Sequence, residues 1–350
     1  MNRLLIGSLF VLIGLAGSAF AEDANAQQMG MVTGSRTGTY IQFGNDIAGI
    51  AKSVGLDILV KDSQGSIDNI KRMNSQENAA LGIVQSDVLG FLSRSENPEM
   101  RQVAERLRLI FPFYNEEVHL FASKSIGSFN DLQGKRVAVG EPGSGSWLTA
   151  TNLLQMTGVK PAELLNLPPL QGVTAVLKGE ADAMFYVAGK PVSLFTTVGN
   201  LITRPENAAM LANVHFVPLD DPRMLREYQP TLIGKADYDW LTEDTSTIMV
   251  KAVLMSFDFS GKKTPYFVQR CEQLAQLGQA IRANLDQLRQ TGHAKWKEVN
   301  LDEKVGIWPL DSCSRHTVKK PGGAKVDLTR ELEKMLLNQQ EWPIRKIPAA

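Results

Sequence analysis

The feature that most constrains the fold of this chain is an order of predicted elements that occurs twice. Each copy contains a strand, a glycine-rich loop, a helix, a second strand, a second helix and a buried third strand. The first copy has its glycine loop at residues 34–38 and ends at Gln85; the second has its loop at 140–146 and ends at Ala188. Alternating strands and helices predict parallel sheets with helices on both faces. The repeat therefore predicts two similar doubly wound α/β lobes with a cleft between them.

The individual elements are predicted from hydrophobic periodicity and turn residues. In the first copy, strands are expected at 31–33, 56–60 and 81–84, and helices from residue 39 and over 66–73. In the second copy, strands are expected at 136–139, 164–167 and 183–187, and helices at 147–156 and 171–178. Thr39 and Gln42 have the spacing of a capping box, which predicts that Thr39 caps the first helix.

Two extended segments are expected to join the lobes. Residues 117–123 alternate as a strand and residues 246–255 return the chain, so two antiparallel crossings would form a hinge. A strand at 214–219, an irregular stretch at 220–244 and a long helix at 265–289 complete the pattern. The predicted domains are lobe 1 at 29–122 and 246–312, lobe 2 at 123–245, and a C-terminal extension with a short amphipathic helix at 313–350.

The first 21 residues have the pattern of a secretory signal peptide. Arg3 precedes an apolar stretch at residues 4–20, which ends in the small-x-small cleavage site Ala19-Phe20-Ala21. An uncleaved anchor is the alternative, but the stretch is interrupted by glycines and is shorter than the ~20 residues that a membrane span needs. No cysteine lies near the cut to carry a lipid. We therefore expect a free periplasmic protein.

The composition excludes several classes of function. Lys and Arg number 37, and so do Asp and Glu, so the chain lacks the positive charge that binding to a nucleic-acid backbone requires. Its two cysteines, Cys271 and Cys313, exclude a disulfide scaffold and any four-thiolate metal site. In an oxidising periplasm a bridge between them is expected, and two free thiols are the alternative.

The two glycine loops each lead from a strand straight into a helix. Backbone N–H groups at a helix start lack intrahelical partners and carry partial positive charge, so such loops can bind anions. Thr37, Thr39, Ser144 and Ser146 add hydroxyl donors, and Arg36 could make a two-pronged bond to a ligand carboxylate. The alternatives are loops that serve only as tight turns and an arginine that is solvated at the surface.

A second group of polar residues lies at the carboxyl ends of predicted strands, where open α/β sheets bind ligands. Asp87, in this group, could instead cap the next helix. The expected ligand-binding residues are Ser35, Arg36, Thr37, Gly38, Thr39, Tyr40, Gln64, Ser66, Gln85, Ser86, Asp87, Gly143, Ser144, Gly145, Ser146, Ala188 and Gly189.

The sequence shows no machinery for common enzyme classes. The glycines of residues 140–146 lack the spacing of a dinucleotide fingerprint, and no acidic residue follows in the region 164–169. No P-loop, G-x-S-x-G or H-E-x-x-H motif occurs, and each of the four histidines is better explained as structural. We therefore expect no catalytic residue, no metal and no cofactor.

A series of motifs resembles the TAXI-type solute receptors of TRAP transporters. The series begins with Thr33-Gly34-Ser35-Arg36-Thr37-Gly38-Thr39-Tyr40 and includes Pro142-Gly143-Ser144-Gly145-Ser146; the other matching motifs lie at 64–69, 81–87, 134–140, 185–191 and 217–219. The resemblance covers residues 31–255. It implies a two-lobed type II periplasmic-binding-protein fold that closes on an organic solute and delivers it to a sodium-driven membrane pair. The resemblance further implies an acidic amino acid or another small carboxylate as the solute, because members of the family are associated with these. The family commonly has glycine where this chain has Arg36, and a second aromatic residue where it has Ile41.

The sequence thus predicts a non-enzymatic periplasmic receptor for a small solute, with a carboxylate-bearing solute favoured and membrane transporter subunits as partners. A monomer is expected. The alternatives are a binding protein for an ATP-driven importer, a ligand sensor for a signalling kinase, and an enzyme. Genes that encode a large and a small membrane subunit beside this one would favour the TRAP assignment. The solute itself is not named by the sequence, because the pocket side chains come from several separate loops.

Overall fold

The computed structural model describes residues 28–36, 38–75 and 78–316. The predicted signal peptide at residues 1–21 and the predicted tail helix lie outside these residues, as does most of the extension at 313–350. Within the described part of the chain, no helix is long and apolar enough to span a membrane.

Lobe 1 is built on three parallel strands in the order β2-β1-β3. These are β1 (Gln28–Val32), β2 (Asp57–Lys61) and β3 (Ala79–Gln85), and they alternate with helices α2 (Thr39–Lys52) and α3 (Ser66–Asn74). The predicted element order is confirmed, but the predicted cap is wrong. Gly38 occupies the N-cap position of α2, and the Gln42 side chain donates to the Gly38 carbonyl oxygen at 3.3 Å.

Lobe 2 repeats the pattern with parallel strands in the order β7-β5-β6. Its elements are β5 (Arg136–Ala138), α6 (Gly145–Thr157), β6 (Glu163–Leu165), α7 (Pro169–Lys178) and β7 (Ala183–Ala188). Gly158 ends α6 with a φ of 75°, a left-handed conformation that favours glycine. The remaining elements are η1 (Phe129–Leu132), α8 (Ser193–Ile202), η2 (Pro205–Asn207), α9 (Ala208–Ala212), β8 (Val214–Phe216), η3 (Met224–Arg226) and β9 (Gln229–Ile233).

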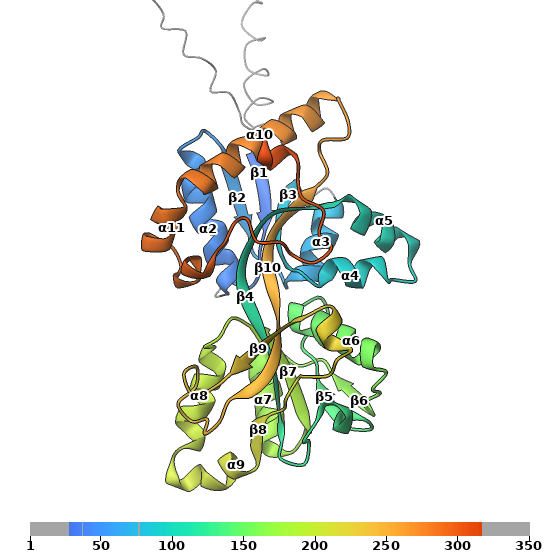
Figure 1. Ribbon diagram of the computed structural model, residues 1–350, viewed down its shortest axis with the longest axis vertical. Coiled ribbons are helices and arrows are strands. Elements are labelled where there is room, and N and C mark those ends of the chain that lie inside the picture. Colours follow the sequence, from blue (N-terminus) through green and yellow to red (C-terminus); the bar gives the residue numbers. More distant parts are fainter. Residues whose placement is uncertain (1–27, 37, 76–77, 317–350) are drawn as a thin grey trace, which may run out of the picture.

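Two long antiparallel strands, β4 (Leu107–Ser123) and β10 (Thr245–Phe257), run through both lobes and join their strands into one sheet (Figure 1). In lobe 1, β10 pairs with β3; in lobe 2, β4 pairs with β7. The pairing of β4 with β10 has register shifts between Lys251 and Val253 and between Leu254 and Met255. This arrangement confirms the predicted fold class of two doubly wound α/β lobes joined by two crossing strands.

The structure differs from the predicted elements in several places. Strand β4 begins at Leu107 rather than 117, because the residues before Glu116 are almost all buried and therefore show no alternation. Strand β8 ends at Phe216 rather than 219, and the stretch predicted as irregular contains β9, which pairs with β10. The predicted long helix is broken at Asn284 into α10 (Pro265–Ala283) and α11 (Leu285–Thr291).

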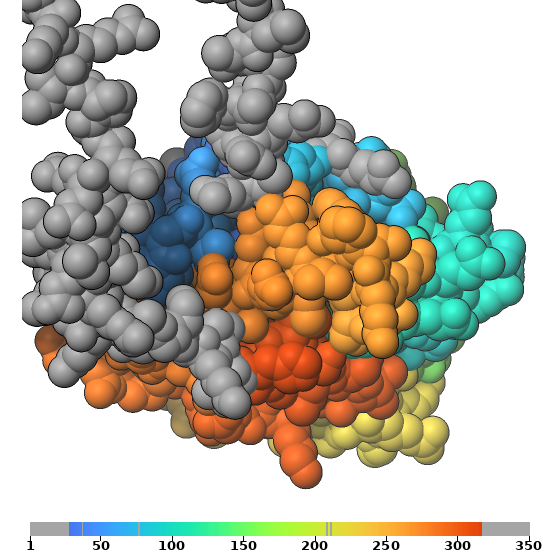
Figure 2. Space-filling view, turned by 90° about the horizontal axis from the view of Figure 1, so that it is seen from above, coloured from blue at the N-terminus to red at the C-terminus, as the bar shows by residue number. Residues whose placement is uncertain are grey.

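The C-terminal part of the described chain packs on lobe 1. Helix α10 and the short helix η5 (Cys313–Arg315) lie side by side, and the sulfur atoms of Cys271 and Cys313 are bonded. Seen from above, residues of this part, in orange and red, form much of the face (Figure 2). The other helices of this lobe are α4 (Val88–Ser93), α5 (Pro98–Arg106) and η4 (Ala294–Glu298).

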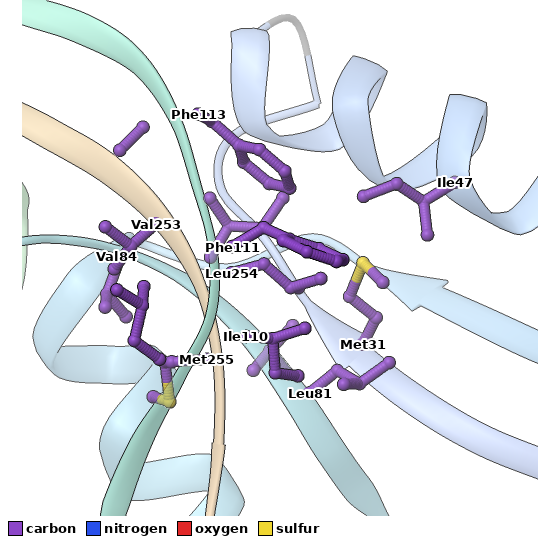
Figure 3. Packing of buried hydrophobic residues seen from close by; sticks show 14 of the residues in the cluster. Met31, Ile47, Leu81, Val84, Ile110, Phe111, Phe113, Val253, Leu254 and Met255 are labelled. Atoms are coloured by element: carbon purple, nitrogen blue, oxygen red, sulfur yellow. The ribbon is translucent and has the colours of Figure 1, made fainter. Parts of the chain in front are cut away.

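The lobes have separate hydrophobic cores. The lobe 1 core combines β1, β3, α2 and the first half of β4 with β10, and its fully buried members include Met31, Ile110 and Leu254 (Figure 3). Burial of one such side chain stabilises the fold by roughly 1.5–3 kcal/mol. Two further clusters lie in lobe 2, around Phe185 on one face of its strands and around Phe195 on the other. The exact domain boundaries given above stay predictions.

Candidate functional site

The lobe 2 glycine loop contacts lobe 1 directly. Gly140 and Gly143 have φ values of 90° and 95°, which favour glycine, and Ser144 caps α6 by accepting a hydrogen bond from the Trp147 N–H at 3.2 Å. The Ile67 N–H of lobe 1 donates to the Gly143 carbonyl oxygen at 3.2 Å. The two lobes therefore meet at one of the predicted corners.

Lobe 1 reaches this corner with its second loop, rather than with its first glycine loop. Gly65 has a φ of 120°, and a Cβ placed on it would lie 3.5 Å from the Gly145 nitrogen. A Cβ on Gly145 would overlap the side-chain oxygen of Gln85. Gln64 also lies near Gly143. Small residues on both sides therefore allow the backbones of the two lobes to approach closely.

The first glycine loop is folded against its own lobe. The Gly38 N–H donates to the Ser35 carbonyl oxygen at 2.9 Å, and both Ser35 and Arg36 are exposed. The Arg36 side chain is 84% exposed and forms an ion pair with Asp62 at 2.9 Å, which lowers the pKa of that carboxyl. Thr37 lies outside the described residues. The structure therefore gives Arg36 a partner at the surface of lobe 1.

Several predicted residues converge on a buried carboxylate that the sequence analysis missed. The Tyr40 hydroxyl, at the start of α2, donates to Glu116 on β4 at 2.7 Å. The Ser66 hydroxyl accepts a hydrogen bond from the Gln85 backbone N–H at 2.9 Å. Ser66, Gln85 and Glu116 are 0%, 2% and 7% exposed. This polar cluster, made of Tyr40, Ser66, Gln85 and Glu116, lies directly beneath the corner at which the lobes meet.

The environment of Glu116 disfavours its charged form. Burial raises the pKa of Glu116 to about 8, the hydrogen bond from Tyr40 acts in the opposite direction, and repulsion by Asp87 raises it further. Burial also raises the pKa of Tyr40 and of Tyr114 well above the usual tyrosine value, and the nearby Glu116 adds to both shifts. Glu116 therefore holds its proton at neutral pH, and the cluster is nearly sealed from water.

Asp87 holds the two lobes together. Its Oδ2 atom accepts hydrogen bonds from the hydroxyls of Thr149 at 2.8 Å and Tyr228 at 3.0 Å, and the Asn152 amide approaches to 3.5 Å. Asp87 belongs to lobe 1 and the three donors belong to lobe 2. Asp87 also occupies the N-cap position of α4, as the alternative prediction has it, but its side chain forms no capping hydrogen bond there. Burial raises the pKa of Asp87.

Other predicted residues have partners within the protein. The Ser86 hydroxyl accepts from the Lys251 N–H at 3.0 Å, and the Ser146 hydroxyl accepts from the Val187 N–H at 2.9 Å. Ala188 pairs with Glu117 on β4, and Gly189 lies against the Lys295 side chain. Thr39 begins α2 close to Tyr114. These contacts fix the local backbone around the corner.

A pocket of about 270 Å³ lies between the lobes beside Asp87. It is lined by residues of lobe 1, lobe 2 and both crossing strands, including Arg94, Glu227, Lys251 and Trp308. Arg94 and Glu227 form an ion pair across the lobes at 2.7 Å, and Lys251 pairs with Glu303 at 2.8 Å. This pocket is separate from the polar cluster, because none of the cluster residues lines it.

Two histidines of the described ranges contact groups of the protein itself, and no metal-binding cluster is found in those ranges. No group of three or more His, Cys, Asp or Glu residues there could hold a metal ion. His119 is fully buried, its two ring nitrogens contact the Glu117 carbonyl oxygen and the Tyr238 hydroxyl, and burial lowers its pKa to about 4. The His215 Nε2 atom contacts the Ile126 carbonyl oxygen at 2.8 Å. Both side chains serve local structure.

One protein family and several solved structures are similar to this chain. The NMT1-like family model matches residues 31–310. The chain is similar to the solved structure of XAC2383 from Xanthomonas citri bound to ATP, at 12% identity over 83% of this chain and 93% of that one, with a TM-score of 0.41. It is also similar to the periplasmic binding protein BugD, at 13% identity over 79% and 89%, with a TM-score of 0.42. A third similar structure is the Bordetella pertussis BvgS VFT2 domain, at 12% identity over 79% and 97%, with a TM-score of 0.39.

Proposed function

Because the chain belongs to the NMT1-like family, we propose that it is a periplasmic receptor that captures a small organic solute between its two lobes. The observation that carries this proposal is the position of the polar cluster. It lies where both lobes and a crossing strand meet, and it is closed over by the Gly143 corner of lobe 2. Ligand sites of open α/β sheets lie at such carboxyl ends of strands.

The proposed binding cycle depends on the two crossing strands. When the lobes separate, the hydrogen bond between Ile67 and Gly143 breaks, and the cluster around Glu116 becomes accessible to solute. Closure then adds contacts from the lobe 2 loop to a solute that already touches lobe 1. A solute favours the closed form only through these additional contacts. The first N–H groups of α6 can receive a carboxylate group of the solute, as the sequence analysis predicts, without any contribution from Arg36.

The proposed partner is a membrane transporter of the TRAP type. This assignment is supported by the motif series in residues 33–219, because its members resemble those of TAXI-type receptors. Delivery would require the membrane subunits to distinguish the closed form from the open one. Neighbouring genes for a large and a small membrane subunit would support this partner. A neighbouring ATPase gene or histidine kinase gene would favour an importer or a sensor instead.

The binding role can be tested with two measurements. Native mass spectrometry of gently purified protein should detect a retained small molecule. Spin labels at the exposed positions Lys52 and Lys178, one in each lobe, should give a longer interlobe distance after the solute is removed and a shorter one when the extracted solute is returned. An unchanged distance, together with no retained molecule, would contradict the receptor role.

A glycine variant sharpens this test. Gly145→Ala places a Cβ in the space of the Gln85 side chain, so it should hinder closure and weaken solute retention. Gly49→Ala is the matched control, because Gly49 lies in α2 with nothing within 4 Å of the added Cβ. Equal solute retention by the two variants would show that the corner is not part of the closing surface.

A further inference from the structure

We infer that the end of lobe 1 that points away from lobe 2 is a docking surface for a membrane with anionic phospholipids. This inference goes beyond solute capture, because the surface lies away from the contact between the lobes. Its starting point is a groove of about 890 Å³ between the end of β10, the start of α10, the end of α5 and the start of β3. Figure 1 shows the connection from β10 to α10 at this end of the molecule, and Figure 2 looks onto the same end.

The groove carries an excess of positive charge. It is lined by three cationic side chains, those of Arg106, Lys262 and Arg270. Asp258 is the one carboxylate among the described residues that line it, and Asp258 already pairs with Arg108 at 2.7 Å. The whole chain has 37 basic and 37 acidic side chains, so this excess is a property of the groove and not of the composition.

Arg270 gives the clearest indication that an anion belongs in the groove. Its side chain is buried, with the residue 6% exposed, and the guanidinium donates to neutral oxygens of Gln28, Gln273 and Asn78 at 2.9 to 3.1 Å. Arginine keeps its positive charge inside proteins, and buried charges are ordinarily paired with an opposite charge. Within residues 28–36, 38–75 and 78–316, no carboxylate forms an ion pair with Arg270.

Aromatic rings hold the other two cations in place. The Arg106 guanidinium lies 4.4 Å from the centre of the Phe257 ring, and the Lys262 ammonium lies 5.0 Å from the centre of the Phe267 ring. The face of an aromatic ring attracts a cation through its quadrupole, but the ring has no net charge with which to neutralise it. Both cations are therefore positioned along the groove and can still pair with an anion.

The rim of the groove adds exposed apolar surface. Tyr266 and Val268, near the start of α10, are 53% and 42% exposed. They belong to an exposed segment, residues 260–268, that also contains Lys262 and Lys263. Basic and aromatic side chains on one exposed segment are typical of protein surfaces that enter the boundary between lipid headgroups and acyl chains.

An anionic phospholipid surface satisfies both features of this site. Its phosphate groups pair with the cations of the groove, and its acyl region receives Tyr266 and Val268. A small soluble phosphate would pair with the same cations and leave those two side chains in water. The occupant that fits the whole surface is therefore a lipid bilayer, with lobe 1 facing the membrane and the contact between the lobes directed away from it.

The test uses residues 22–350, so that the apolar stretch of the predicted signal peptide makes no contribution. Co-sedimentation compares vesicles of phosphatidylglycerol and phosphatidylcholine in equal parts with vesicles of phosphatidylcholine alone. Binding to the anionic vesicles should be at least about tenfold stronger, and added salt should weaken it. Calorimetry with glycerol 3-phosphate, a soluble counterpart of the headgroup, should show no measurable binding.

Variants locate this preference in the groove. Arg106→Gln combined with Lys262→Gln should weaken binding to anionic vesicles by about tenfold or more, since each cation near such a surface contributes about fivefold. Lys178→Gln combined with Lys235→Gln is the matched control, because it removes the same charge from exposed positions of lobe 2. Tyr266→Ser should weaken binding to both kinds of vesicle and keep the preference for the anionic kind. Thermal unfolding of each variant without vesicles shows whether it is folded.

Every result decides the inference. Absence of vesicle binding, equal binding to the two kinds of vesicle, or a preference that the folded groove variant keeps would overturn it. Equal losses in the groove variant and the lobe 2 control would overturn it as well. Binding of glycerol 3-phosphate without binding of vesicles would make the groove a site for a soluble anion instead. The receptor role is independent of these results, because the solute retained in native mass spectrometry decides it separately.

Discussion

Two buried carboxylates of lobe 1 lie near the interface between the lobes, and their surroundings differ. Asp87 is held by hydroxyl groups of Thr149 and Tyr228 from lobe 2. Glu116 has the hydroxyl of Tyr40 and the side chain of Gln85 as hydrogen-bond partners, both from its own lobe. Burial raises the pKa of both. The difference in partners assigns them different roles.

This comparison shows that burial alone does not identify a binding residue. Asp87 accepts hydrogen bonds from lobe 2 at its Oδ2 atom and so contributes to the contact between the lobes, while its buried Oδ1 atom has no partner among the described residues. Glu116 receives its hydrogen bonds from Tyr40 and Gln85, both in lobe 1. The origin of the partners therefore separates a carboxylate that holds the lobes together from one that belongs to a single lobe.

The pH dependence of stability should give the largest difference between the two sites. The pKa of Glu116 is about 8 in the folded protein against an ordinary value of 4.5, so the folded state holds its proton more tightly. Its contribution to the free energy of unfolding is therefore fully present below about pH 4.5 and is lost as the pH rises through about 8. The total loss is roughly 3 to 5 kcal/mol. Urea unfolding across this range, for wild type and Glu116→Gln, checks this.

In the Glu116→Gln variant, the free energy of unfolding should not show this part of the decline with rising pH. The difference between the variant and the wild type separates the effect of Glu116 from that of other titrating groups. A constant difference at all pH values would show that Glu116 titrates normally. The titratable groups that act on Glu116, or on which it acts, are Tyr40, Asp87, Tyr114, Glu117 and Tyr186.

Asp87→Ala should have the next largest effect. It removes the close acceptor of the buried Thr149 and Tyr228 hydroxyls and leaves Thr149 with only its 3.4 Å contact to the Gln85 side-chain oxygen, so the free energy of unfolding should fall by about 1 to 3 kcal/mol. The interlobe distance measured between spin labels should lengthen as well. Asp87→Asn keeps the shape of the side chain and one oxygen acceptor, so its free energy of unfolding should fall by less than that of Asp87→Ala. Equal stability of wild type and Asp87→Ala would show that this contact does not hold the lobes together.

Glu227→Gln should have the smallest effect. The ion pair between Arg94 and Glu227 also crosses the lobes, but the two side chains are 40% and 41% exposed. Pairs at such sites contribute about 0.2–1 kcal/mol, and salt screens them. The loss in unfolding free energy should therefore be small at low salt and vanish at high salt. A loss larger than that of Asp87→Ala would reverse the ranking of the two contacts.

Local patterns were sufficient to predict most of the fold. The doubled order of strands and helices, and the two crossings, follow from periodicity and from glycine positions that need no knowledge of distant contacts. The structure confirms them. The first half of β4 was missed because a strand buried on both faces loses its alternation. The cap at Thr39 was misplaced by one residue, since glycine at the N-cap leaves no side-chain signal.

The candidate site was less predictable, because its members come from distant segments. Tyr40, Ser66 and Gln85 were found from their positions at the ends of strands and the starts of helices. Glu116 lies inside a strand, and its signal was the pair of glutamates within an otherwise apolar run. The surface position of Arg36 depends on Asp62, which is 26 residues away in the chain. Pairings of this kind depend on the tertiary fold.

The irregular register between β4 and β10 has a mechanical consequence. The slips lie at Lys251–Val253 and Leu254–Met255, opposite a stretch of β4 that includes Pro112, a residue with no backbone donor. An interruption of this kind bends a strand locally and increases its twist. Because Val253, Leu254 and Met255 pair with β3 and are fully buried in the lobe 1 core, the bend shapes the interior of that lobe. The crossing between the lobes is carried by the regular pairing of β10 with β4 just before these slips, from Met249 to Lys251.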